Sequence, residues 1–356
     1  MKIKLSEKDL KKSYRLLDTK EINISIADLL FYTFDDNKFF KGVNDPTFYF
    51  EKLVEFWNIN PEDKEDYSIL KKWVKPVIFP AKEDFFYQNS YFNNVKPNPI
   101  KSNGYELKYL SFKSYQPFSL DEIIVDNNDY YLERSPISYF TIEQKYLALS
   151  YKDEVWMSIT PNEINTMKPY IESSKGDVLV FGLGLGYYPY MISLKDDVKN
   201  ITIIELDKNI IDLFNKYIFP FFPHKEKIKI IQDDALSYLA NNKKHYDTVF
   251  ADLWHNPVDG LPLYIKLKNL EKDKNTNYQY WLEKSLIALT RRCLLTIYEE
   301  ALKGYNDKDY LKNDNPIDTI INSLYFKTKN ITINNYDDIY NLLSDSNIIK
   351  IICSLN

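Results

Sequence analysis

Glycine is rare in this chain, and long apolar runs are absent. Only 8 of the 356 residues are glycine, about a third of the usual share of roughly 7%. This composition excludes collagen-like, glycine-linker and low-complexity chains. No stretch approaches the roughly 20 apolar residues of a membrane span, and the N-terminus carries charge where a signal peptide needs an apolar run. We therefore expect a soluble, cytoplasmic protein without membrane association.

Cysteine is rarer still, with only Cys293 and Cys353 in the sequence. The two lie far apart and near no histidine cluster, so they offer neither a disulfide framework nor a zinc site. This usage fits a reducing compartment. We expect no bound metal.

Aromatic residues are abundant, with 30 Tyr, 21 Phe and 5 Trp. Each ring buries roughly 150–250 Å² in a core, so a large folded core is expected and overall disorder is not. The net charge is −5, from 46 Lys and Arg against 51 Asp and Glu. No global field attracts phosphate backbones, so we expect no non-specific nucleic-acid binding, while a local basic patch and a homodimer stay open.

Composition and periodicity divide the chain into four regions. Prolines 76, 80, 97 and 99 end a helical pattern. Alternating residues then indicate strands, before a pattern of alternating strands and helices begins near Pro161. The predicted regions are an N-terminal helical region (1–98), a small β layer (99–160), a Rossmann-like domain (161–305) and an unassigned C-terminal region (306–356).

Within these regions the sequence predicts individual elements. A helix capped by Ser6 with Asp9 is followed by separate helices at 24–34, 46–57 and 62–74. Strands in the β layer are expected at 107–111, 137–139, 146–149 and 155–159. Residues 280–302 favour a long helix, with 294–297 as an alternative strand.

The region 177–252 alternates between strand and helix. Expected strands at 177–181, 201–206, 228–231 and 247–252 are almost wholly apolar, and helices are expected at 186–194, 208–218 and 235–240. Apolar strands joined by helices indicate a doubly wound parallel sheet buried on both faces. The fold class is therefore α/β, a Rossmann-like parallel sheet preceded by a helical region and a small β layer.

Half of the eight glycines lie within eleven positions, at 176, 182, 184 and 186. Gly182, Gly184 and Gly186 directly follow an expected buried strand. One explanation is a tight strand-to-helix turn that needs positive φ. The other is a loop whose bare backbone lets a nucleotide-like ligand approach the helix N-terminus. In a glycine-poor chain, three alternating glycines favour the ligand site.

The spacing argues against a dinucleotide. The fingerprint G-x-G-x-x-G requires glycine where this chain has Tyr187. The observed G-x-G-x-G resembles motif I of the class I S-adenosylmethionine-dependent methyltransferases and of the related spermidine synthases. The resemblance covers about residues 175–255.

This resemblance implies a set of ligand-binding residues around S-adenosylmethionine. Gly182, Gly184 and Gly186 would hold its amino-acid side. Glu205, 23 residues after Gly182, could accept both ribose hydroxyls. Further positions are Asp234 and Ala235 at the adenine, with Asp233 as the rival acid and a candidate N-cap, and Asp252 at the reacting group.

The sequence also departs from both families. Many methyltransferases carry an acid where this chain has Val180, and spermidine synthases carry an Asp where it has Leu185. The loop after Asp252 lacks the second acid of spermidine synthases, and a diamine needs carboxylates to hold its ammonium groups. Polyamine transfer therefore loses support.

The sequence leaves the roles of four aromatic or imidazole side chains undecided. Trp254 could form a substrate wall, and His255 could act as a general base or simply be exposed. Tyr187 and Tyr188 could touch the ligand or pack in the core.

The first hypothesis is an S-adenosylmethionine-dependent methyltransferase in which Asp252 orients or deprotonates the acceptor. The acceptor, a small molecule or a protein, is left open. The alternatives are an aminopropyltransferase, similar to spermidine synthase, with an altered acceptor, or a non-catalytic binding protein on the same fold.

Overall fold

A parallel β-sheet forms the centre of the second half of the chain. The computed structural model describes residues 1–35, 40, 45–307, 310 and 316–355. Five strands pair in the order β13-β12-β11-β14-β15, all parallel. This sheet confirms the predicted α/β class. The strands are β11 (Gly176–Phe181), β12 (Val198–Glu205), β13 (Ile228–Gln232), β14 (Thr248–Ala251) and β15 (Asn277–Tyr280).

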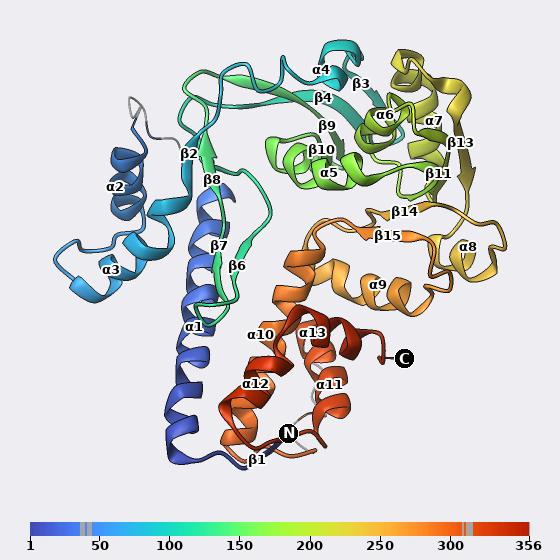
Figure 1. Ribbon diagram of the computed structural model, residues 1–356. Helices are drawn as coiled ribbons and strands as arrows, with labels where there is room; N and C mark the ends of the chain where they lie inside the picture. The colour runs from blue at the N-terminus through green and yellow to red at the C-terminus, as the bar shows by residue number, and fades with distance from the viewer. Residues whose placement is uncertain (36–39, 41–44, 308–309, 311–315, 356) are drawn as a thin grey trace.

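Helices cover both faces of this sheet (Figure 1). The helices α5, α6 and α7 lie on one side, and α8 and α9 lie on the other. The central strands β11 and β12 consequently have almost no exposed apolar surface, and each such buried side chain contributes roughly 1.5–3 kcal/mol. The helices are α5 (Pro161–Ser173), α6 (Tyr187–Ser193), α7 (Lys208–Tyr217), α8 (Ala235–Asn241) and α9 (Pro257–Asn269), with short 3-10 turns at Phe219–Phe221 and Lys225–Lys227.

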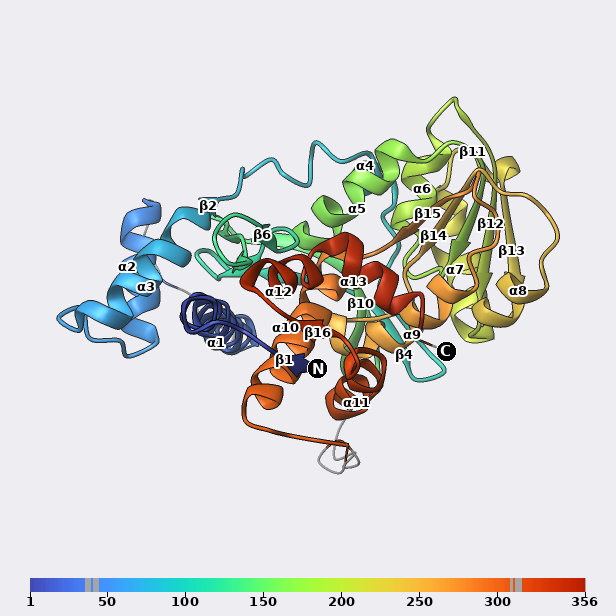
Figure 2. The ribbon, with the colours of Figure 1, turned by 60° about the horizontal axis from the view of Figure 1, so that its bottom comes forward.

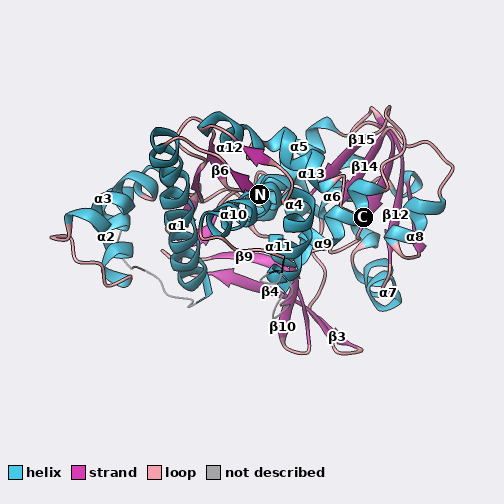
Figure 3. Ribbon diagram, turned by 90° about the horizontal axis from the view of Figure 1, so that it is seen from below, coloured by secondary structure: helices cyan, strands magenta, loops and turns pink. Residues whose placement is uncertain are grey.

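A separate antiparallel sheet precedes the parallel one, with the order β10-β9-β4-β3. Figure 3 shows β4, β9 and β10 gathered apart from β12, β14 and β15. The expected strand at 137–139 forms, but as β8 it pairs with β2 and β5 in another small sheet. The strands are β3 (Ile100–Ser102), β4 (Tyr105–Phe112), β9 (Gln144–Tyr151), β10 (Glu154–Ser158), β2 (Ile78–Pro80), β5 (Phe118–Ser119), β8 (Ile137–Tyr139), β6 (Ile124–Asp126) and β7 (Leu132–Arg134).

One long helix, α1 (Glu7–Asp35), replaces the two helices predicted near the N-terminus. The Ser6 cap is confirmed, because its hydroxyl accepts from the backbone N–H of Asp9 at 3.1 Å. The helix passes through Thr19 without a break, and the hydroxyl of Thr19 donates to the carbonyl of Arg15 one turn earlier at 2.8 Å. Next come α2 (Pro46–Phe56), α3 (Lys64–Trp73), a 3-10 turn (Lys75–Val77) and α4 (Ser90–Asn94). The C-terminal end of α1 packs with α2 and α3 around a small apolar cluster that is separate from the main core.

The C-terminal region, unassigned from the sequence, is mostly helical. It contains α11 (Pro316–Thr328), β16 (Thr332–Ile333), α12 (Tyr336–Leu342) and α13 (Asp345–Ile352). Before it, α10 (Glu283–Leu302) includes residues 294–297, so the alternative strand there is wrong. Leu294 and Ile297 are fully buried on this helix, which explains an apolar run that also resembles a strand.

The two ends of the chain meet. Strand β1 (Lys2–Ile3) pairs in parallel with β16, and α1 contacts α10 and α12 (Figures 1 and 2). Lys20 of α1, 4% exposed, forms an ion pair with Glu299 of α10 at 2.7 Å. In the described residues, the parallel sheet ends at β15 and no antiparallel strand follows it. None of the described helices combines the length and the apolar character needed to cross a membrane.

Candidate functional site

The loop between β11 and α6 takes its shape from three glycines with left-handed φ: +93° at Gly182, +54° at Gly184 and +77° at Gly186. At two of them the reason is close packing. A Cβ at Gly182 would lie 2.1 Å from the carbonyl oxygen of Asp252, and one at Gly186 would lie 2.4 Å from the ring of Phe214. These two glycines join the loop to β14 and to α7.

Gly184 differs from its neighbours because nothing crowds it. The only atom within 4 Å of a Cβ there would be the sulfur of Met157, at 3.9 Å. Open space next to bare backbone is what a ligand needs to approach the N-terminus of α6. The packing explanation therefore holds for Gly182 and Gly186, whereas the backbone at Gly184 is left uncrowded and the ligand explanation stays a prediction there.

Glu205, at the end of β12, holds the glycine loop against the neighbouring strand. Its Oε2 accepts from the backbone N–H of Leu183 at 3.0 Å, and its Oε1 accepts from that of Asp207 at 2.8 Å. Each carboxylate oxygen keeps a second lone pair, because an oxygen of this kind has two. Glu205 can therefore accept two further hydrogen bonds from vicinal hydroxyls.

Asp234 caps α8, since its side chain accepts from the backbone N–H of Ser237 at 2.8 Å. The expectation that Asp233 is the N-cap is wrong. Asp233 instead donates from its backbone to the carbonyl of Glu205 at 3.1 Å, which places both acids beside β12. Ala235 is buried at the first turn of α8. Leu206, which the sequence analysis missed, exposes 66% of its surface directly after Glu205.

Asp252 follows β14 and faces a second acid, Glu163, that the sequence analysis missed. Burial raises the pKa of Asp252 to about 7. Burial, and then the like charge of Asp252, raise the pKa of Glu163 to about 8 against the opposing effect of its hydrogen bond from Thr160. In the described residues the Asp252 carboxylate receives no hydrogen bond. Two acids with raised pKa values at the switch point of the sheet are typical of a functional site.

Glu163 escaped notice because its pattern has a structural explanation. With Thr160 it forms a capping box at the start of α5, in which its Oε2 accepts from the Thr160 backbone N–H at 3.0 Å. The available signal was the position of this box directly after β10, the strand that carries Met157. The other carboxylate oxygen of Glu163, Oε1, takes no part in the capping box and is available to the site.

The antiparallel sheet covers the carboxyl end of the parallel one. Trp156 of β10 packs edge-on against His255, with ring centroids 4.7 Å apart. The hydroxyl of Tyr105 on β4 donates to Asp207 at 2.5 Å. The antiparallel sheet thus lies against the carboxyl end of the parallel sheet, and the sulfur of Met157 on β10 is 3.9 Å from the position that a Cβ at Gly184 would take.

The contacts of the aromatic side chains favour packing roles for Tyr187, Tyr188 and Trp254, while both alternatives for His255 stay open. Tyr188 stacks on Phe250 at 3.9 Å, and Tyr187 accepts from Asn89 at 2.9 Å, so both are packing residues. Trp254 is 4% exposed and donates to the carbonyl of Trp281 at 3.0 Å, which places it in the core. His255 is exposed, with its Nδ1 3.1 Å from Asp259.

The site is strongly acidic. Lys208, the nearest lysine in sequence to Glu205, is paired with Asp212. Over the described residues no lysine or arginine pairs with the site acids, and no group of three or more His, Cys, Asp or Glu is arranged to hold a metal ion. A positively charged ligand would therefore be favoured here over one bearing a carboxylate. The acids are Glu163, Glu205, Asp234 and Asp252.

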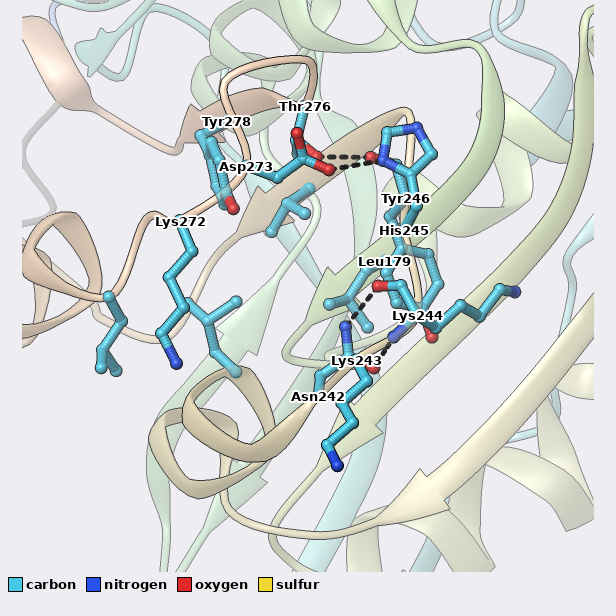
Figure 4. A pocket seen from close by; sticks show the side chains of 13 residues that line it. Leu179, Asn242, Lys243, Lys244, His245, Tyr246, Lys272, Asp273, Thr276 and Tyr278 are labelled. Carbon is cyan, nitrogen blue, oxygen red and sulfur yellow. Dashed lines mark hydrogen bonds and ion pairs between the residues drawn. The ribbon is translucent and has the colours of Figure 1, made fainter.

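A hollow of about 160 Å³ lies at the opposite edge of the parallel sheet (Figure 4). Three of its basic groups have partners: His245 is 2.7 Å from Asp273, Lys244 is 3.2 Å from Asp177, and Lys272 donates to a backbone carbonyl. No residue of the glycine loop and none of the four site acids lines this hollow, so it is separate from the candidate site.

Comparison with known proteins finds a partial match. A family model described as "Spermine/spermidine synthase domain" matches residues 164–261. The polyamine aminopropyltransferase of Buchnera aphidicola subsp. Acyrthosiphon pisum (strain Tuc7) is 32% identical over 96 residues, 26% of this chain and 33% of that protein. The enzyme of the same name from Buchnera aphidicola subsp. Schizaphis graminum (strain Sg) is 32% identical over 83 residues, 21% of this chain and 28% of that protein. The chain thus spans about a third of the length of the curated relatives it matches.

Solved structures give weaker likenesses. Spermidine synthase from Thermotoga maritima aligns with 14% identity and a TM-score of 0.26, over 36% of this chain and 47% of that one. A putative O-methyltransferase from Klebsiella pneumoniae aligns with 14% identity and a TM-score of 0.24, over 30% of this chain and 49% of that one. The family match spans the glycine loop, Glu205, Asp234 and Asp252, and begins one residue after Glu163.

Proposed function

We propose that this protein transfers an aminopropyl group from decarboxylated S-adenosylmethionine to an amine acceptor. The observation that carries the proposal is the pair of acids, Glu163 and Asp252, at the glycine loop, where the carbonyl of Asp252 packs against Gly182. The partial match to the spermine/spermidine synthase domain supports the same chemistry. An acidic site also disfavours the α-carboxylate of S-adenosylmethionine and tolerates the decarboxylated donor.

The donor would lie along the carboxyl ends of β11, β12 and β13. Bare backbone at Gly184 would admit the sulfonium side, and Glu205 would accept from the ribose hydroxyls. The exposed face of Leu206 suits a flat purine, with Asp234 and the backbone N–H of Ala235 at its polar edge. Catalysis would then consist largely of holding acceptor and donor in line and excluding water.

The acids would serve the acceptor. An amine reaches the site as an ammonium ion and must lose a proton before its nitrogen can attack. A carboxylate whose pKa is about 7, as for Asp252, can accept that proton near neutral pH. The amine lone pair then forms a C–N bond to the methylene next to sulfur, the C–S bond breaks, and its electron pair returns to sulfur, leaving methylthioadenosine. Glu163, whose pKa of about 8 leaves it mostly protonated near neutral pH, would accept a hydrogen bond from the ammonium group through its carbonyl oxygen beforehand.

A calorimetric panel tests this proposal. We expect decarboxylated S-adenosylmethionine and methylthioadenosine to bind more tightly than S-adenosylmethionine and S-adenosylhomocysteine. Asp252→Asn and Glu163→Gln should leave methylthioadenosine binding intact while abolishing amine-dependent turnover. Glu154→Gln is a matched control, because Glu154 is an exposed carboxylate on β10. Tighter binding of S-adenosylmethionine, or full turnover in both acid variants, would contradict the proposal.

Methyl transfer from S-adenosylmethionine is the second candidate, favoured by one observation. Leu185 stands where spermidine synthases carry an Asp, and its side chain is 4% exposed, so it supplies no charge to the site. The calorimetric order of the two donors separates the candidates. Binding of a donor without turnover on any acceptor would instead indicate a non-catalytic binding protein.

A further inference from the structure

A second, larger hollow lies on the face of the antiparallel sheet, beneath the segment that contains α4. Its volume is about 620 Å³, within the roughly 300–1,000 Å³ of small-molecule sites. No site acid and no residue of the glycine loop lines it. The lining residues come from 86–96, β4 and β9: Phe86, Tyr87, Tyr91, Phe92, Asn93, Val95, Lys96, Tyr109, Glu143, Gln144, Lys145 and Leu147.

The base of this hollow is apolar and well packed. Phe86, Tyr91, Val95 and Leu147 are each at most 4% exposed. The rings of Phe86 and Phe92 pack with centroids 4.5 Å apart. Side chains held this firmly form a pre-shaped surface, which an apolar ligand can cover at little cost in side-chain entropy.

The rim adds aromatic and basic groups. Tyr87 is 73% exposed and Tyr109 is 38% exposed, so two further rings are available at the opening. Glu143 is paired with Lys113 at 2.8 Å. Lys96 and Lys145 are exposed and take part in no ion pair with any described residue. The rim therefore has two lysines outside any such ion pair, and its single carboxylate, Glu143, is bonded to Lys113 and also attracted by the nearby charge of Lys145.

We propose that this hollow is a second binding site, for a small molecule with a flat apolar body and one anionic group, such as an aromatic carboxylate or sulfonate. The apolar base and exposed rings would bury the body, and Lys96 or Lys145 would pair with the anion. This chemistry is opposite in charge to that of the acidic site, so the two hollows select different ligands. The inference does not rest on the proposed transferase activity.

The second site borders the first through one side chain. The ring of Tyr91 lines the hollow while its hydroxyl donates to the backbone carbonyl of Leu185, in the glycine loop, at 2.6 Å. A ligand in the hollow therefore contacts a residue that fixes the loop. The two ligands would bind at once, on opposite sides of Tyr91.

Two fluorescent probes with the same aromatic body test this site in the full chain. 1-Anilinonaphthalene-8-sulfonate is anionic, and N-phenyl-1-naphthylamine lacks the sulfonate. We expect the anion to bind at one saturable site, more tightly than the neutral probe. Replacing both lysines, by Lys96→Gln with Lys145→Gln, should weaken the anion about tenfold, the effect of losing roughly 1.4 kcal/mol of charge pairing, and leave the neutral probe unchanged.

Controls separate the hollow from other surfaces. Lys168→Gln, on α5 and 70% exposed, removes an exposed lysine away from the hollow and should leave both probes unaffected. Tyr87→Ala should weaken both probes, because it removes a ring that they share. Displacement of the anion by methylthioadenosine would place the probe in the donor site and overturn the proposal. So would absence of saturable binding, or equal affinity in the double lysine variant.

Discussion

Gly184→Ala is expected to separate ligand binding from folding. An alanine methyl at this position meets only the sulfur of Met157 at 3.9 Å, whereas one at Gly182 would overlap the carbonyl oxygen of Asp252 at 2.1 Å. The backbone at both positions has positive φ. Both substitutions therefore carry a backbone penalty, and Gly182→Ala adds a steric overlap that Gly184→Ala lacks.

The expected stability changes follow from the backbone penalty and the steric overlap. Left-handed backbone costs an L-residue roughly 1–2 kcal/mol, and replacing glycine returns about 0.4–1 kcal/mol through the unfolded state. We expect Gly184→Ala to lower the free energy of unfolding by about 1 kcal/mol. Gly182→Ala must also move a backbone carbonyl at the end of a central strand, so we expect a loss of about 3 kcal/mol or more.

The affinity for ligand should fall more in Gly184→Ala than in Gly182→Ala, the reverse of the order expected for stability. The new methyl of Gly184→Ala occupies the space in front of the loop, so methylthioadenosine should bind at least about tenfold more weakly. Urea unfolding measures the first quantity and calorimetry the second. A Gly184→Ala protein that unfolds as readily as Gly182→Ala, or that binds methylthioadenosine like the parent, would refute this division of roles.

Three further predictions concern single side chains. Burial raises the pKa of Asp252 from 3.8 to about 7, so the folded state binds more protons than the unfolded state between these pH values. The free energy of unfolding should therefore fall as pH rises from 4 to 7. Urea titrations of Asp252→Asn should show a smaller fall. Tyr91→Phe should cost about 1 kcal/mol of stability and weaken methylthioadenosine severalfold in calorimetry, with an unchanged affinity arguing against the loop contact. Arg291→Leu should lower the free energy of unfolding by about 2–4 kcal/mol in urea, because this buried guanidinium donates to the Leu343 carbonyl at 2.9 Å. A loss under about 0.5 kcal/mol, the size of an ordinary surface effect, would contradict a stabilising role for Arg291.

The parallel sheet could be predicted because its strands are continuous apolar runs ended by glycine or acid. Val178–Phe181 and Ile201–Ile204 are at most 7% exposed, so burial on both faces leaves a clear pattern. The glycine loop follows from the same logic. Its division into two closely packed glycines and one uncrowded glycine could not be predicted, because it depends on contacts with Asp252 and Phe214, far away in sequence.

Other features depend on contacts with residues far away in the sequence, which the local sequence pattern does not reveal. Strand β15 pairs with β14 through Asn277–Tyr280, a short edge strand whose polar residues carry little strand signal. Glu163 joins the site only because α5 begins opposite Asp252. The pairing of β1 with β16 connects opposite ends of the chain, which no window of sequence contains.

Product analysis tests the central claim most directly. The protein is incubated with an amine mixture and either decarboxylated S-adenosylmethionine or S-adenosylmethionine, and the nucleoside products are identified by mass spectrometry. Transfer of the aminopropyl group predicts methylthioadenosine together with an amine that has gained an aminopropyl group, from the decarboxylated donor alone and lost in Asp252→Asn. Release of S-adenosylhomocysteine with a methylated acceptor would contradict it.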